Sequence, residues 1–438
     1  MQDFEKISVV GLGYIGLPTA TILATNQVSV IGVDVNPDTV ATINRGEIHI
    51  IEPDLDEAVH SAVSGGWLKA VQTAEPADAF LIAVPTPFVR EDRKPDLTYI
   101  EAASRAIAPV LEAGNLVILE STSPVGATEQ MARWLAEERP DLTFPHQAGE
   151  NSDIRIAHCP ERVLPGKVMQ ELISNDRIVG GATARCANEA RKLYEIFVKG
   201  ECLLTDLRTA EMCKLAENAF RDVNIAYANE LSMICDGLNI NVWELIRLAN
   251  HHPRVNILQP GAGVGGHCIA VDPWFIVSSA PKQANLIRTA RQTNDAKPEW
   301  VMEKVRTAAA QFAKQHNRNP KIAALGLAFK PDIDDLRESP ALHIAQRLYE
   351  EHGDRLMVVE PNVESLPTVI EGCSLVSLDQ ALAGADIVVV LVDHAAFAKL
   401  KTLELSAGQV IIDAVGLLAR EKKPILTEPI AQYISAAE

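Results

Sequence analysis

The stretch ISVVGLGYIG, residues 7–16, decides the fold class of this chain. Its first four residues form a short apolar strand pattern, its glycines follow the spacing GxGxxG, and residues 17–25 continue as a helix pattern. A strand, a tight glycine turn and a helix in this order are typical of a doubly wound α/β domain that binds a dinucleotide. A turn that merely packs a helix against a sheet is the alternative.

An acidic residue ends the second predicted strand, which covers residues 28–34. In this pattern Gly11 permits the tight turn, Gly13 lets a pyrophosphate approach the backbone, and Gly16 allows close helix packing. Asp34 can accept hydrogen bonds from ribose hydroxyls and would repel a 2′-phosphate, so NAD is favoured over NADP. The predicted cofactor-binding residues of this region are Gly11, Gly13, Tyr14, Ile15, Gly16 and Asp34.

Two further loops follow predicted buried strands at residues 79–84 and 116–120. The loops read VPTP at 84–87 and STSP at 121–124. Open α/β sheets bind ligands beyond the carboxyl ends of their strands. Thr86 and Thr122 are therefore predicted to contact the cofactor, although a proline-rich turn with a hydroxyl is common in any loop.

The remaining sequence is first helical and then alternates strand and helix again. Helix patterns cover residues 211–235, 242–249 and 284–315, and a further helix is predicted at 341–350. Later apolar strand patterns occur at 322–325, 356–360, 387–392 and 410–413. We expect an α/β protein with two doubly wound Rossmann-like domains joined by a mostly helical middle domain. The expected boundaries are 1–205, 206–315 and 316–438.

Composition excludes several classes of protein. The net charge of −18 argues against a nucleic-acid-binding surface. The sequence contains no run of about 18 apolar residues, so no membrane span is predicted. The N-terminus lacks the basic segment of a signal peptide, so a cytoplasmic location is expected. Seven cysteines without a CxxC pair suggest neither a disulfide framework nor a zinc site, and no metal is expected.

A second glycine-rich loop, GAGVGGHC at residues 261–268, ends on a cysteine. Its glycines would let a substrate approach the backbone, and Cys268 would then be a nucleophile. Asp272 follows four residues later, one turn away if a helix begins there. His267 is less favoured for a direct role, and an inert, partly buried thiol is the alternative.

Polar residues at helical spacing add to this chemistry. Lys214, Asn218 and Arg221 are spaced i, i+4 and i+7 and share one helix face. Such a face is either solvated or lines a cavity, where a lysine and an amide stabilise an oxyanion or position a water. An NAD site plus a loop thiol predicts a four-electron oxidation. A thiohemiacetal can lose a second hydride to give a thioester, which water hydrolyses.

Seven motifs, in order, resemble the UDP-glucose/GDP-mannose dehydrogenase family. They are GxGxxG with Asp34, VPTP at 84–87, STSPVG at 121–126, CPERVLPG at 159–166, EMCKLAENAFRDVNIAYANE at 211–230, GVGGHCIAVDP at 263–273 and GLAFKPDIDDLRES at 326–339. HPRVNILQPG and GGHCIAVDPWF resemble bacterial members that act on UDP-N-acetyl-D-mannosamine. The resemblance implies NAD-dependent oxidation of the C6 hydroxyl of that sugar to a carboxylate, for surface polysaccharide.

The family's roles are implied for the matching residues. Cys268 resembles the thiol nucleophile, Lys214 the residue that stabilises the oxyanion or shuttles protons, and Asn218 the amide that positions the reacting oxygen or water. Asp272 resembles the acid behind the cysteine, and Glu161 the base for thioester hydrolysis.

Further implied contacts concern the cofactor and the nucleotide sugar. Thr122 resembles a hydroxyl near cofactor and water, and Arg337 a cofactor contact from the C-terminal domain. The implied substrate-binding residues are Arg162, Val163, Lys214, Asn218, Arg221, His252, Arg254, Gly265, Phe329 and Lys330. His252 and Arg254 are implied to lie near a subunit interface, in a homodimer or larger assembly built through the middle helices.

One departure and three alternatives stay open. Val415 stands where some relatives have a basic residue, a role that Arg420 could take. The same chemistry could act on UDP-N-acetylglucosamine or UDP-glucose. A single-step hydroxyacid dehydrogenase would use Lys214 and Asn218 without a thiol, and a nucleotide-sugar sensor would bind NAD without turnover.

Overall fold

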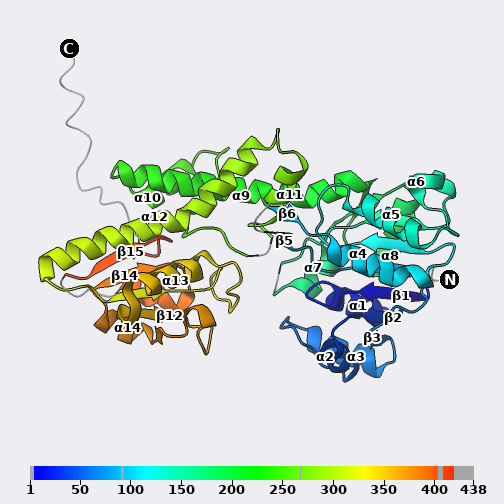
Figure 1. Cartoon of the computed structure of the whole chain (residues 1–438), viewed down its shortest axis with the longest axis horizontal. Coiled ribbons are helices and arrows are strands. Elements are labelled where there is room, and N and C mark those ends of the chain that lie inside the picture. Colours follow the sequence, from blue (N-terminus) through cyan, green and yellow to red (C-terminus); the bar gives the residue numbers. More distant parts are fainter. Residues whose placement is uncertain (1–3, 90–92, 165, 267, 403–407, 419–438) are drawn as a thin grey trace, which may run out of the picture. The chain divides into compact units, whose positions relative to one another are not determined.

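The computed structural model describes residues 4–89, 93–164, 166–266, 268–402 and 408–418. These residues form two compact units, coloured along the sequence in Figure 1. The first unit contains the chain up to Asn218 together with Val271–Ala284. The second contains Ala219–Ala270 and the chain from Asn285 onward.

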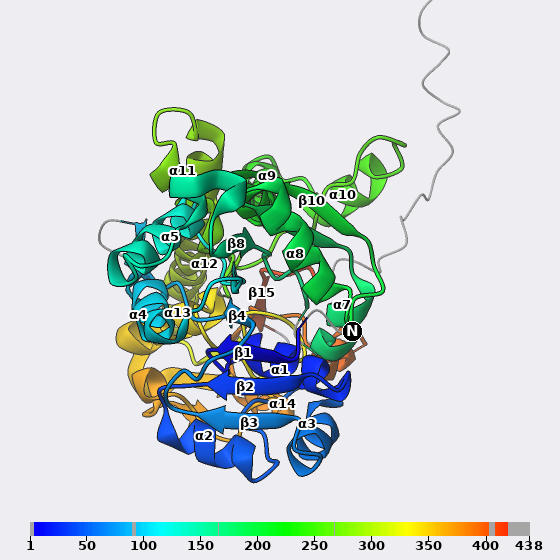
Figure 2. The ribbon, with the colours of Figure 1, turned by 90° about the vertical axis from the view of Figure 1, so that its right-hand side faces the viewer.

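An eight-stranded sheet, among the described residues, forms the centre of the first unit. Its central strand β1 (Lys6–Val10) pairs in parallel with β2 on one side and β4 on the other, so the strand order changes direction there. The blue strands β1, β2 and β3 lie side by side in Figure 2. The remaining strands, in sheet order, are β10 (Cys202–Asp206), β9 (Arg177–Gly181), β8 (Arg155–His158), β7 (Leu116–Leu119), β4 (Ala79–Ile82), then, beyond β1, β2 (Ser29–Val33) and β3 (Leu68–Val71).

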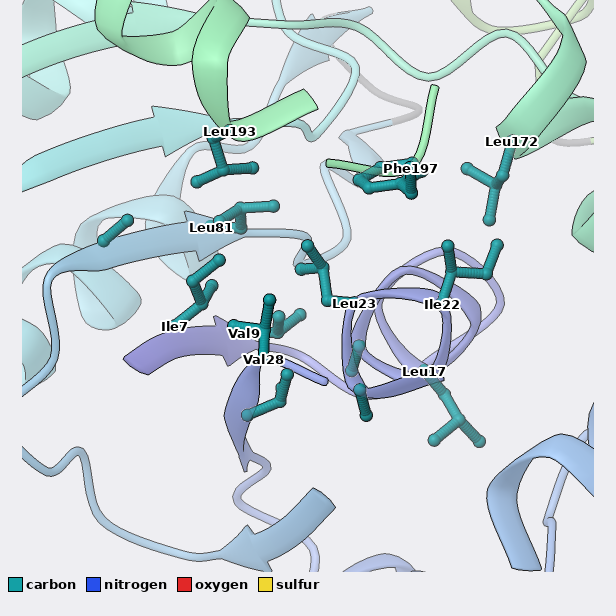
Figure 3. Close-up of a cluster of buried hydrophobic side chains, with 14 of the residues drawn as sticks. Ile7, Val9, Leu17, Ile22, Leu23, Val28, Leu81, Leu172, Leu193 and Phe197 are labelled. Atoms are coloured by element: carbon teal, nitrogen blue, oxygen red, sulfur yellow. The ribbon is translucent and has the colours of Figure 1, made fainter. Parts of the chain in front are cut away.

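Helices cover both faces of this sheet and bury its apolar side chains. On one face Leu17, Ile22 and Leu23 of α1 pack with Ile7 and Val9 of β1 in the cluster that Figure 3 shows. The other face is covered by α4 and α5. The helices are α1 (Gly16–Thr25), α2 (Pro37–Asn44), α3 (Leu55–Ser64), α4 (Thr98–Ile107), η1 (Ala108–Val110), α5 (Ala127–Glu138), α6 (Pro145–Ala148), η2 (Gly149–Asn151), α7 (Val168–Ser174), α8 (Ala184–Tyr194), the start of α9 (Leu207–Gly237) and α11 (Asp272–Ser279), with a small hairpin of β5 (Phe88–Val89) and β6 (Lys94–Pro95).

A five-stranded parallel sheet, within the described residues, forms the centre of the second unit. One face packs against α12 and α13, and the other against α14 and η5. The strands, in sheet order, are β13 (Ser374–Leu375), β12 (Leu356–Val359), β11 (Ile322–Leu325), β14 (Ile387–Val390) and β15 (Val410–Asp413). The helices are α10 (Val242–Ala249), α12 (Asn285–His316), α13 (Pro340–His352), η3 (Gly353–Arg355), η4 (Thr368–Ile370), α14 (Leu378–Gly384) and η5 (Ala395–Lys401).

The predicted fold class is confirmed. The strands expected at residues 322–325 and 410–413 and the helix expected at 242–249 have those bounds in the structure. The predicted helical middle segment is present, and it is divided between the two units. The three-domain boundaries therefore stay a prediction. Among the described residues, no helix combines the length and apolar character needed to cross a bilayer.

Candidate active site

The first glycine turn has the shape of a phosphate-binding loop. Gly11 has a φ of +89°, and its N–H donates to the carbonyl of Val33 at 2.8 Å. A Cβ on Gly16 would lie 1.8 Å from the oxygen of Gly11, so glycine is required where α1 begins. A Cβ on Gly13, by contrast, would meet no atom within 4 Å. The turn therefore leaves open space beside Gly13 at a helix N-terminus, which suits a pyrophosphate.

Asp34 stands at the end of β2 and organises the same turn. Its Oδ2 accepts the N–H of Leu12 at 2.9 Å, and its Oδ1 accepts the N–H of Asn36 at 2.9 Å. The carboxylate is partly exposed, and each oxygen keeps a second lone pair that can accept a ribose hydroxyl. Tyr14 lies on the surface of this turn, where its hydroxyl donates to Ile51.

The two predicted loops meet at the carboxyl ends of β4 and β7. The Ser121 hydroxyl donates to the carbonyl of Val84 at 2.7 Å and joins the loops. Within the described residues, the buried hydroxyl oxygen of Thr86 has no hydrogen-bond partner. Thr122 is partly buried in the second loop. An unpartnered buried hydroxyl beside an open glycine turn fits a bound polar ligand such as NAD.

Lys214 and Asn218, which helical spacing placed on one face with Arg221, lie near Asp272 in the first unit. The Asn218 side-chain amide donates to Asp272 Oδ2 at 2.5 Å. Asp272 is the first residue of α11 and is buried. Burial raises the pKa of Asp272 to about 6, although the hydrogen bond from Asn218 and the charge of Lys214 oppose the shift. This carboxyl can therefore take up or release a proton close to neutral pH.

Glu161 follows β8 and is held by a buried cation. Its Oε2 accepts from the Arg177 guanidinium at 2.7 Å, and its Oε1 accepts the N–H of Arg162 at 2.6 Å. The Arg162 side chain pairs with Glu217 at 3.1 Å. Val163 packs against the hydrophobic core of the first unit. Glu161 is thus oriented through both oxygens, which reduces its freedom as a base.

The cysteine loop belongs to the second unit, and its glycines serve packing. A Cβ on Gly265 would lie 2.4 Å from the carbonyl oxygen of Glu338, and a Cβ on Gly266 would lie 3.1 Å from the Phe329 ring. Gly263 and Gly266 also have positive φ angles of +146° and +84°. Close contact with the segment after β11 is therefore a sufficient reason for these glycines, one that the sequence did not reveal.

Cys268 is exposed just before the chain reaches α11. All seven cysteines lie within the described residues and none forms a disulfide, and the other six are buried or partly buried. Burial raises the pKa of Cys159 to about 12 and that of Cys373 to about 11. His267, its predicted neighbour, lies outside the described residues.

The predicted substrate residues of the second unit are spread over several elements. Phe329 is partly buried and Lys330 exposed in the turn after β11. Arg221 on α9 and His252 and Arg254 after α10 are exposed. Arg337 is exposed and pairs with Asp335 at 2.6 Å. Val415 is buried in the apolar cluster below β15, and Arg420 lies outside the described residues.

Several residues of these sites were missed at the sequence level. Buried Glu120 accepts from the Tyr194 hydroxyl at 2.7 Å, and burial raises its pKa to about 7. Glu211 on α9 accepts from Gly126 and Thr128 at the start of α5. No local sequence pattern predicts such long-range pairs. Glu360 is different, because it follows β12 as Asp34 follows β2, and that parallel could have found it.

Comparison with known proteins identifies the family. The profile of the UDP-glucose/GDP-mannose dehydrogenase NAD-binding domain matches residues 5–198, that of the central domain 208–296, and that of the UDP-binding domain 323–420. An NDP-N-acetyl-D-galactosaminuronic acid dehydrogenase of Ralstonia nicotianae is 62% identical over 96% of this chain and 98% of its own length. The UDP-N-acetyl-D-mannosamine dehydrogenase of Escherichia coli is 61% identical over 95% of this chain and all of its own length.

A solved structure shows the same architecture. The UDP-N-acetylmannosamine dehydrogenase of Pyrococcus horikoshii is similar with a TM-score of 0.83 and 39% identity, over 96% of this chain and 97% of that one. The cofactor is NAD, which the turn at Gly11 and Asp34 fits. The chain therefore belongs to the UDP-glucose/GDP-mannose dehydrogenase family, with an NAD-binding domain first, a central domain next and a UDP-binding domain last.

Proposed function

We propose that this protein oxidises the C6 hydroxyl of UDP-N-acetyl-D-mannosamine to the carboxylate, with two NAD consumed per sugar. The observation that carries the proposal is an exposed thiol, Cys268, four residues before the buried Asp272 that binds Asn218. A dehydrogenase that stopped at an aldehyde would need the carboxyl and the amide but no thiol. The names of the relatives from Escherichia coli and Pyrococcus horikoshii support the choice of sugar.

The first oxidation removes a proton from the C6 hydroxyl and a hydride from C6, which gives an aldehyde. The thiolate of Cys268 then adds to that carbon and forms a thiohemiacetal, whose oxyanion Lys214 and Asn218 stabilise. Loss of the second hydride leaves a thioester. Water adds to the thioester carbon, the carbon–sulfur bond breaks, and the carboxylate and the free thiol are released. NAD supplies the hydride acceptor in both oxidations.

Proton transfer is assigned first to Asp272. Its pKa of about 6 lets it accept a proton at neutral pH and return it. Glu161 is the other carboxylate proposed for thioester hydrolysis. Because Arg177 and the Arg162 N–H fix both of its oxygens and leave each a second lone pair, we assign it the orientation of the attacking water instead. Thr122 and Arg337 remain the proposed additional contacts to the cofactor.

A homodimer or larger assembly is part of the proposal, as is a cytoplasmic location. Phe220, Tyr227 and Ile234 are spaced seven residues apart on α9 and so lie along one face of this helix. Their exposed fractions are 72%, 54% and 51%. An apolar stripe of this size supports self-association through the helix.

The decisive experiment measures NADH formed per limiting sugar. UDP-N-acetylmannosamine should give two NADH per sugar. UDP-N-acetylglucosamine, UDP-glucose and UDP-N-acetylgalactosamine are run in parallel, the last because the Ralstonia relative is named for a galactosaminuronic acid. One NADH per sugar would remove the thiol from the mechanism. Two NADH from another sugar would keep the mechanism and change the substrate.

Replacing the thiol tests the covalent step directly. Cys268→Ser should lower the rate of acid formation at least about a thousandfold, because serine at neutral pH is a much weaker nucleophile. NAD affinity, measured by fluorescence titration, should stay unchanged, since the cofactor turn lies in the other unit. A Cys268→Ser protein that still made acid at the original rate would overturn the covalent thiol mechanism.

A further inference from the structure

The turn after β11 is held by hydrogen bonds to one buried carboxylate. Glu360 stands directly after β12, and its Oε2 accepts the N–H of Leu327 at 2.7 Å and that of Ala328 at 3.1 Å. Its Oε1 accepts the N–H of Asn362 at 3.1 Å. The carboxylate is buried, so these hydrogen bonds are made away from solvent and are correspondingly strong.

A buried histidine extends this support along the turn. His394 has no exposed surface, and its Nε2 lies 3.1 Å from Glu360 Oε2. Its Nδ1 accepts the N–H of Asp332 at 3.0 Å. The imidazole hydrogen is therefore assigned to Nε2, which donates it to Glu360. His394 thus ties the far end of the turn to the carboxylate that holds its beginning.

Asp332 shows that the turn is constrained. Its φ of +58° lies in the left-handed region, which residues other than glycine seldom adopt. The conformation is fixed by the hydrogen bond to His394 and by Asp332 Oδ1, which accepts the N–H of Ala395 at 2.9 Å. Backbone strain of this kind persists where neighbours over-determine it and is concentrated at ligand clamps.

The constrained turn carries two predicted substrate-binding residues and packs against the cysteine loop. Phe329 and Lys330 lie between the anchored positions 328 and 332, inside the UDP-binding domain. Gly266, two residues before Cys268, packs against the Phe329 ring. The shape of this turn therefore bears on the nucleotide and on the loop of the thiol together.

We propose that Glu360 and His394 are positioning residues that hold residues 326–332 in the shape required by the uridine diphosphate part of the substrate before it binds. Neither residue touches the nucleotide in this proposal. This proposal rests on the proposed function in one respect, that the substrate carries uridine diphosphate. It does not depend on which sugar is bound or on the thiol chemistry. The probe is therefore UDP alone, so that a wrong sugar or a wrong nucleophile leaves the test unaffected.

His394 Nδ1 also lies 3.1 Å from the side-chain nitrogen of Asn362, and two conservative variants separate the contacts of Nδ1 from the hydrogen bond of Nε2. In His394→Asn the side-chain oxygen can still accept the N–H of Asp332, whereas in His394→Gln the amide nitrogen can still donate to Glu360. Each variant should raise the Kd for UDP about tenfold, and His394→Leu, which loses the hydrogen bonds of both ring nitrogens, about a hundredfold. The Kd for NAD should change less than about twofold, because the glycine turn and Asp34 lie in the other unit. Isothermal titration of the full-length protein measures both.

Leu348→Ala is the matched control for general destabilisation of the same sheet. Leu348 is buried on α13, and its apolar side chain makes none of the hydrogen bonds that hold the turn. It should lower the melting temperature and leave the Kd for UDP unchanged within about twofold. His394 variants that lower the melting temperature as Leu348→Ala does, with no weaker binding of UDP, would overturn the proposal.

Hydrogen exchange of the unaltered protein tests whether the turn is ordered before UDP binds, even if the variants fail to fold. Without nucleotide, the amides of Leu327, Ala328 and Asp332 should already exchange as slowly as those of the adjacent strand. Fast exchange that slows only when UDP is added would mean that the ligand, and not Glu360 with His394, shapes the turn. That result would also overturn the proposal.

Discussion

The turns after β1 and after β11 start with the same two residues and the same geometry. Gly11 and Gly326 have φ angles of +89° and +92°. Each donates its N–H at 2.8 Å to the last residue of the neighbouring second strand. The N–H of the following leucine, Leu12 or Leu327, is accepted by an acidic side chain just after that second strand. Both units therefore build the turn with one backbone design.

The acids differ in what else they hold. Asp34 is partly exposed and keeps acceptor capacity for a ligand. Glu360 is buried and bonded to His394 as well as to the turn. In the second turn, Ala328 and Pro331 stand where the first turn has Gly13 and Gly16. The next helix after this turn begins only at Pro340. One turn therefore keeps its acid open to a ligand, while the other uses its acid internally to fix a loop.

The largest expected effect separates the packing glycine from the ligand glycine. Gly16→Ala places a Cβ 1.8 Å from the oxygen of Gly11, so α1 must shift and the free energy of unfolding should fall by about 3 kcal/mol. Gly13→Ala fills only open space and should leave stability unchanged within about 0.5 kcal/mol. It should nevertheless weaken NAD at least about tenfold, since the added methyl group occupies the pyrophosphate position. Urea denaturation and NAD titration check the pair, and equal loss of stability in both variants would contradict the assignment.

An intermediate effect is expected at the two acids. Glu360→Gln should lower the free energy of unfolding by about 2 kcal/mol, because an amide nitrogen would face N–H donors in a buried site. Asp34→Asn should cost less than about 0.5 kcal/mol and should instead raise the Kd for NAD about tenfold. The reverse ranking, with stability lost at Asp34 and binding of NAD unaffected, would contradict the different roles of the two acids.

The pH dependence of stability tests whether Glu360 is ionised in the folded protein. Burial alone would raise the pKa of Glu360, but hydrogen bonds from His394, Leu327 and Asn362 hold it below its ordinary value of 4.5. Since the folded-state pKa is the lower one, the stabilisation is fully present above 4.5 and is lost as the pH falls through the folded value. Urea unfolding between neutral pH and acid should therefore show the wild type approaching Glu360→Gln. A gap that stayed constant into acid would argue against an ionised Glu360.

The smallest effect is expected from restoring a glycine to the second turn. Ala328→Gly reproduces the GxG start of the cofactor turn but should cost only about 1 kcal/mol, through the lost methyl group and the greater freedom of the unfolded chain. It should gain no second NAD site, because Glu360 stays engaged by His394. Titration to saturation should still give one NAD per chain. Two per chain would show that the residue at 328, and not the acid, separates the turns.

Much of this arrangement could be predicted from the sequence. The glycine pattern with Asp34 and the apolar strands indicated the doubly wound sheet, because these signals are local. The cluster of Lys214, Asn218 and Asp272 was also partly foreseen, since helical spacing placed the first two on one face and Asp272 was expected near a helix start. The structure adds that the helix begins at Asp272 itself.

Other features depend on contacts that no local pattern records. The first sheet is extended by β9, antiparallel to β8, and by β10, although no strand was predicted there. The pairing of Glu161 with Arg177 follows from that extension, because Arg177 is the first residue of β9. The glycines before Cys268 were attributed to substrate approach, while their close contacts are with Phe329 and Glu338. Packing of this kind becomes visible only when distant segments meet.

The uneven burial of the seven cysteines has a practical consequence. Six are shielded to differing degrees, and Cys268 alone is exposed. A mild alkylating reagent should therefore modify one site per chain, and the label incorporated would count the intact thiols in a preparation. Dividing turnover by that count yields a rate per competent molecule, independent of how much of the sample has been lost to oxidation.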